Sequence, residues 1–266
     1  MNASTPEPAA PGEPAPPRAA RPSSLLARLF NVLAAPGEVF AEVRDGPPRA
    51  AHWVLPACLL ILVGWLGTWL VFSQPVFRHQ QDEIQLRVLQ RMVENGKLRR
   101  EQFEQLQQNL GGGGPAKYML GPAVAVLGLA VVSPFWGAFL IWLIGAKLHG
   151  GRFAYGKALE VAGLANMVAV LGSLVRTLMI LALGRLQAAP TPALMLPDFD
   201  PFNPLHAALA TLDLFGVWVC GVRAAGMAVL GGPAWGRGFA WLVAIWAGLN
   251  GLLVAACWGV SRLLGF

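Results

Sequence analysis

Long apolar runs constrain this chain more than any other feature of its sequence. One of them, "WVLPACLLILVGWLGTWLVFS" (53–73), contains no charged side chain. A helix of about 20 apolar residues is long enough to cross the hydrocarbon core of a bilayer. Only 13% of the residues in the chain are charged, whereas a soluble domain usually has about 25%. The sequence therefore predicts an all-α polytopic membrane protein.

Runs of this kind predict five transmembrane helices, at about 53–73, 118–146, 159–184, 206–230 and 239–262. The short loop between the second and third spans carries Lys147, Arg152 and Lys157. The positive-inside rule therefore places this loop in the cytoplasm, together with the arginine-containing N-terminus. This orientation places the insert between the first two spans outside the cytoplasm. The insert is also rich in Lys and Arg, so its charge conflicts with the positive-inside rule.

Two segments precede the first span. Residues 1–22 are rich in proline and alanine, have little to bury and are expected to be disordered. They also lack the apolar core of a signal peptide, so we expect the first span to direct insertion. Residues 23–50 contain two short amphipathic patterns separated at Pro36, and we expect these helices to lie in the membrane interface. The remainder, 51–266, is the predicted membrane domain.

A polar insert at 74–117 interrupts this membrane domain. Apolar residues recur at helical spacing on both sides of Asn95-Gly96, a dipeptide typical of turns. The insert is therefore predicted to form a helical hairpin. Its apolar stripes either contact a partner protein or pack on the protein's own bundle.

Polar residues inside the spans are candidates for structure or function, because charges in a bilayer are rare and usually paired or functional. Arg176 and Asp213 lie about 13 Å and about 10 Å from the same side of the membrane at 1.5 Å per residue. We expect them to form an interhelical ion pair, with a proton or ion relay as the alternative. Arg223 is expected to snorkel to the headgroups, and Asn166 and Asn250 to form hydrogen bonds between helices.

Motifs of common enzyme sites do not occur: the sequence has no H-E-x-x-H, no G-x-x-x-x-G-K-[ST] and no G-x-S-x-G. The histidines are scattered near span ends, and the three cysteines fall inside apolar runs. We therefore expect no catalytic residue, no cofactor-binding site, no metal site and no nucleic-acid partner. The expected partners are the lipid bilayer and either a membrane protein or a second copy of the chain.

Three short segments form a recognisable set: "AAPGEVFAEV" (34–43), "GGRFAYGKALEVAGLAN" (150–166) and "LDLFGVWVCGVRAAGM" (212–227). The positions that carry the pattern are Pro36, Phe40, Asp213, Phe215 and Trp218. Together they resemble the bacterial branch of the Ypt-interacting protein (YIP) family of five-span membrane proteins. The resemblance implies that Asp213 is an architectural residue of the fold.

The resemblance also bears on function. Eukaryotic members of the family help to organise Golgi and endoplasmic-reticulum membranes and bind small GTPases. A non-enzymatic membrane scaffold or adaptor is therefore the leading expectation, and the composition favours a bacterial cytoplasmic membrane. The alternative is a small transporter or channel subunit that uses Arg176 and Asp213.

Overall fold

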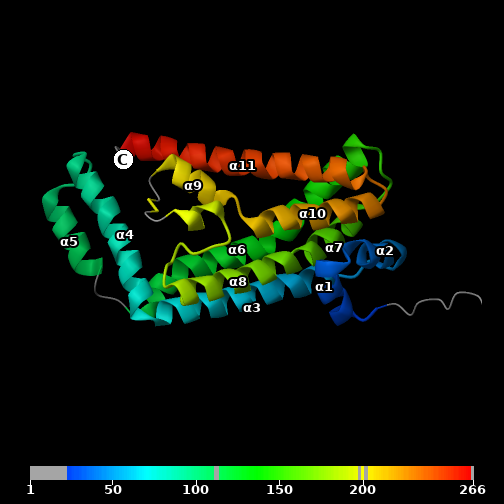
Figure 1. Cartoon of the computed structure of the whole chain (residues 1–266), viewed down its shortest axis with the longest axis horizontal. Helices are drawn as coiled ribbons and strands as arrows, with labels where there is room; N and C mark the ends of the chain where they lie inside the picture. The colour runs from blue at the N-terminus through cyan, green and yellow to red at the C-terminus, as the bar shows by residue number, and fades with distance from the viewer. Residues whose placement is uncertain (1–22, 111–113, 197–198, 201–202, 265–266) are drawn as a thin grey trace, which may run out of the picture.

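The computed structural model describes residues 23–110, 114–196, 199–200 and 203–264, and within these residues it is entirely helical (Figure 1). The tail at 1–22, expected to be disordered, lies outside the described residues. Four helical segments are long and apolar enough to cross a membrane: Ala51–Ser73, Pro115–Leu148, Tyr155–Leu183 and Trp235–Gly259. A helix pair bent by 42°, Pro204–Thr211 and Leu214–Val229, makes a fifth if it counts as one span. The prediction of an all-α polytopic membrane protein is confirmed.

These spans run back and forth along the long axis of the molecule (Figure 1). In chain order they are α3 (Ala51–Ser73), α6 (Pro115–Trp142) with the π-helical turn η1 (Leu143–Leu148), α7 (Tyr155–Ala165) with α8 (Met167–Leu183), α9 (Pro204–Thr211) with α10 (Leu214–Val229), and α11 (Trp235–Leu264). A short 3₁₀ helix, η2 (Pro192–Met195), lies in the loop before α9. The helix α3 packs on α6, α7 and α8, α6 packs on α7, and α10 packs on α11.

The two helices that precede the first span, α1 (Leu25–Ala34) and α2 (Pro36–Asp45), lie at one end of this bundle (Figure 1). Ser24 begins α1, because its Oγ accepts a hydrogen bond from the backbone N–H of Ala27 at 3.2 Å. Pro36 is the first residue of α2, where its fixed φ suits a helix start. Leu29, Val32 and Phe40 are buried in the main core. The two helices are thus part of the folded bundle, and their place in the membrane interface stays a prediction.

The insert after the first span consists of α4 (Pro75–Glu94) and α5 (Arg100–Leu110), which pack on each other at the opposite end of the bundle (Figure 1). The turn that follows α4 contains Gly96 at φ 70°, a left-handed conformation that favours glycine. The N-terminal helices and this hairpin therefore mark the two ends of the membrane bundle.

Candidate functional site: a buried polar network beneath the N-terminal helices

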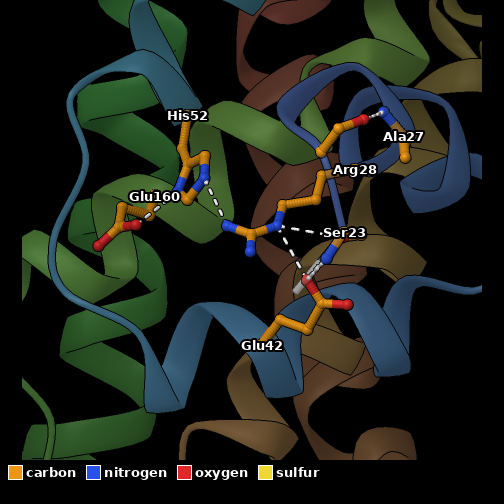
Figure 2. Close-up of polar contacts among 7 residues, drawn as sticks. Ser23, Ala27, Arg28, Glu42, His52 and Glu160 are labelled. Carbon is orange, nitrogen blue, oxygen red and sulfur yellow. Dashed lines mark hydrogen bonds and ion pairs between the residues drawn. The ribbon is translucent and has the colours of Figure 1, made fainter. Parts of the chain in front are cut away.

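Four charged or polar side chains are buried in the described part of the chain: Arg28, His52, Glu160 and Asn166. The first three lie together where α1 and α2 cover the start of α3 and the first turns of α7 (Figure 2). Buried charges are costly unless they are paired and hydrogen-bonded. The cluster is therefore the strongest candidate site in the fold.

One half of the cluster joins α1 to α2. The Arg28 Nε donates to Glu42 Oε2 at 2.9 Å and to Ser23 Oγ at 3.2 Å. The Ser23 hydroxyl in turn donates to Glu42 Oε2 at 2.5 Å. The hydrogen bond from Ser23, together with the nearby Arg28 charge, lowers the pKa of the Glu42 carboxyl below its ordinary value, although partial burial opposes the shift.

The other half joins α1 to the membrane bundle. Arg28 Nη1 lies 3.2 Å from His52 Nε2, and His52 Nδ1 lies 2.5 Å from Glu160 Oε2. A guanidinium has donors but no acceptor. Nε2 must therefore accept from Arg28, and the ring proton is on Nδ1, which donates to Glu160. This assignment follows from the hydrogen-bond partners and makes His52 neutral.

Lys157 completes the cluster on α7. Its Nζ lies 3.4 Å from Glu160 Oε1 and donates to the carbonyl oxygens of Val43 and Gly46, each at 2.6 Å. Carbonyls at a helix C-terminus have no partner within the helix, so a lysine there satisfies them. Lys157 therefore fixes the end of α2 to the bundle.

The network balances its own charges, because Arg28 and Lys157 face Glu42 and Glu160 around a neutral histidine. Among the described residues no group of three or more His, Cys, Asp or Glu side chains could hold a metal ion. The arrangement can dock the N-terminal helices on the membrane bundle.

A second polar cluster lies deeper in the bundle. Asn166, at the break between α7 and α8, donates from Nδ2 to Ser133 Oγ at 2.8 Å and accepts from Arg223 Nη2 at 3.0 Å. The prediction that Arg223 snorkels to the headgroups is wrong, because its guanidinium turns into the bundle. Gly137 makes room for it: a Cβ there would lie 2.6 Å from Arg223 Cζ. Arg223 Nε is buried without a hydrogen-bond partner.

The ion pair expected between Arg176 and Asp213 is not formed in the structure. The chain bends between α9 and α10, and Asp213 becomes the residue that begins α10. Its Oδ1 accepts a hydrogen bond from the backbone N–H of Phe215 at 3.1 Å. Arg176 is exposed, and no ion pair or hydrogen bond of its side chain occurs within the described residues. The Asp213 carboxylate therefore caps α10 and does not pair with Arg176.

The aromatic residues of the predicted motifs lie in packing contacts, and two of them join different helices. Phe40 of α2 packs at Gly226 of α10, where a Cβ would lie 3.1 Å from its ring. Phe215 packs at Gly172 of α8 and stacks on Trp218, with ring centroids 6.0 Å apart.

Asn250 differs from Asn166, because its side chain bonds within its own helix. Its Nδ2 donates to the carbonyl oxygen of Trp246 at 2.8 Å. No hydrogen bond joins it to another helix in the described part of the chain.

The sequence patterns do not single out Arg28, Glu42 or Glu160, and the place of His52 near a span end predicts an ordinary interfacial histidine. One signal was available: Glu160 is a carboxylate inside the third predicted span. Arg28 is also the single charged residue in the first amphipathic pattern. Charges in such places need partners.

One of three comparisons with known proteins finds a match. A search of curated proteins and a search of solved structures find none. The family model of the Yip1 domain matches residues 30–257, which include α2, the α4–α5 hairpin and the membrane spans from α3 to most of α11. The chain therefore belongs to the Yip1 domain family.

Proposed function

We propose that this chain is a non-enzymatic membrane scaffold or adaptor of the Yip1 type. The observation that carries the proposal is the α4–α5 hairpin, which extends from one end of the bundle (Figure 1). A surface held in a fixed position loses little conformational entropy when it binds a partner. The hairpin meets this condition because its base is firmly attached and its second helix is open.

Contacts with the membrane bundle hold the base of the hairpin. The Phe77 side chain is 1% exposed. Gln80 Nε2 donates to the carbonyl oxygen of Gly184 at 2.7 Å. The Tyr118 hydroxyl lies 2.9 Å and 3.0 Å from the two carboxylate oxygens of Asp82. These contacts come from α6 and from the end of α8, so α4 cannot swing freely.

The second helix carries exposed side chains. Leu106 on α5 is 42% exposed, and its neighbours Gln105 and Gln107 are exposed as well. Apolar side chains at the centre of a polar rim are the usual anatomy of a protein–protein contact. We therefore assign partner binding to α5.

The test is photocrosslinking from Leu106, replaced by a photoreactive amino acid, in intact membranes. Leu252 on α11 is the matched control, because it is an exposed leucine on a membrane span and should contact lipid. The proposal expects one recurrent foreign protein from position 106 and not from position 252. Adducts of position 106 to its own chain alone, or the same adducts at both positions, would contradict it.

For the location we propose a bacterial cytoplasmic membrane with the N-terminus in the cytoplasm. The basic loop that contains Lys147, Arg152 and Lys157 supports this orientation. A membrane-impermeant thiol reagent should label a cysteine at Gln105, but not one at Asn31, from outside intact cells. The reverse pattern would invert the topology.

A transporter or channel subunit is the second candidate, and one observation favours it. Two spans are interrupted, at Asn166 and at Asp213, and interrupted helices often line substrate sites in transporters. The side chain that reaches the first break is Arg223. Solute flux into proteoliposomes that is lost in Arg223→Met but retained in the exposed variant Arg176→Met would support this candidate. Equal flux in empty liposomes would reject it.

A further inference from the structure

The contact between Arg28 on α1 and His52 on α3 depends on the protonation of the histidine. The 3.2 Å approach of Arg28 Nη1 to His52 Nε2 is a hydrogen bond only while Nε2 carries no proton. The other ring nitrogen, Nδ1, is held 2.5 Å from Glu160 Oε2. The docked arrangement therefore requires the singly protonated ring.

A second proton would enter at Nε2, the nitrogen that faces the guanidinium. Two donors and two positive charges would then meet at a place where the His52 side chain is 1% exposed. Water cannot relieve this repulsion there, because both groups are removed from solvent. The contact that docks α1 would become one that repels it.

The charges around His52 decide which contact is lost. Glu160 of α7 attracts the protonated ring and stays bound, while Lys157 beside it opposes the extra charge. Glu42 of α2 bonds Arg28 and not the histidine. The helices α6 and α8 also pack on α3. Within the described ranges neither gives His52 an ion pair or a hydrogen bond from a charged side chain. Protonated His52 therefore keeps its partner on α7 and loses its partner on α1.

The second helix of the pair has independent attachments. Phe40 of α2 is fully buried against α10. Lys157 bonds two carbonyl oxygens at the end of α2, and neither bond involves the histidine. Loss of the Arg28–His52 contact should therefore release α1 from the start of α3, while α2 remains in place and keeps its bond from Arg28 to Glu42.

We propose that His52 is a pH-sensitive switch that docks α1 on the membrane bundle when singly protonated and releases it when doubly protonated. Among side chains, histidine is the one whose unperturbed pKa places its change of charge between about pH 5 and pH 8. Release would uncover the Leu29 and Val32 side chains, which are buried in the docked state. The inference concerns α1 and does not depend on the adaptor role of the hairpin.

The test uses the full chain in lipid nanodiscs with its native cysteines replaced by serine. Spin labels at Asn31 on α1 and Arg237 on α11, both exposed, report the position of α1 by pulsed dipolar spectroscopy. A second pair, Glu38 and Arg237, reports α2. When the pH is lowered from 8 to 5, we expect the α1 pair to show a second, longer distance between the labels, and the fraction of molecules with this longer distance to rise at least tenfold. The α2 pair should not change.

Two variants make the result specific. In His52→Gln the amide can accept from Arg28 and donate to Glu160 but does not titrate in this range, so α1 should stay docked at both pH values. In Arg28→Gln the amide can donate to a neutral histidine or accept from a protonated one, so the pH response should again vanish. No pH response in the parent protein, or a parent-sized response in either variant, would overturn the proposal.

Discussion

Replacing Glu160 with leucine should lower the free energy of unfolding by about 3 kcal/mol. The carboxylate is 3% exposed and serves both His52 Nδ1 and Lys157 Nζ. Removal of one member of a buried charged pair usually costs about 3–5 kcal/mol, because its partner is left uncompensated. We expect the lower end of this range, since Lys157 is 15% exposed and keeps its bonds to two carbonyl oxygens.

The assay is reversible unfolding in mixed micelles, followed by the signal of the native tryptophans. Glu104→Leu on α5 is the matched control, because it removes an exposed carboxylate and should change the free energy of unfolding by no more than about 0.5 kcal/mol. Glu160→Gln should lower the free energy of unfolding less than Glu160→Leu does, because the amide oxygen of glutamine can still accept a hydrogen bond from His52. If Glu160→Leu and Glu104→Leu have the same effect, the network does not stabilise the fold and the reasoning fails.

Three further predictions follow from individual contacts. Asp213→Ala should lower the free energy of unfolding by about 1 kcal/mol, the value of a helix cap, whereas Asp213→Asn should leave it nearly unchanged in the same assay. A loss of several kcal/mol in both variants would indicate a buried ion pair instead. Gly163→Ala should cost about 1–3 kcal/mol, because its Cβ would meet the backbone and Cβ of Trp53; an unchanged unfolding midpoint would contradict this close approach. The pKa of Glu42 is lower in the folded protein than in the unfolded chain, so Glu42 stabilises the fold above the unfolded pKa and loses this contribution as pH falls through the folded pKa. Ser23→Ala should reduce this contribution, as measured by the free energy of unfolding as a function of pH. The same loss of stability at acidic pH in Ser23→Ala and in the parent protein would argue against the hydrogen bond.

Composition was sufficient to predict the class of fold, because long apolar runs leave few alternatives to membrane helices. It did not predict where the spans are interrupted. The run at 206–230 reads as one helix, yet the structure bends it by 42° between Thr211 and Leu214. The interruption depends on the extended backbone of Asp213 and on its side-chain cap. Hydropathy averages over such single residues.

The buried network was harder to predict, because its members are far apart in sequence. His52 and Glu160 are separated by 108 positions, so no local pattern joins them. The apolar stripe on α1 predicts a helix that lies in the membrane interface. In the structure Leu29 and Val32 face the core, whereas Phe30 is 67% exposed. A short helix with apolar residues on both sides has two possible faces, and tertiary contacts select between them.

The central claim is that buried polar contacts dock the N-terminal helices onto the membrane bundle. The most direct measurement is hydrogen–deuterium exchange of the α1 amides (25–34) in lipid nanodiscs at pH 8, compared between the parent protein and Glu160→Leu. Docking predicts protected α1 amides in the parent, exchange at least about tenfold faster in the variant, and no change in α4. Amides of α1 that exchange in the parent as fast as those of an unfolded peptide would contradict the claim.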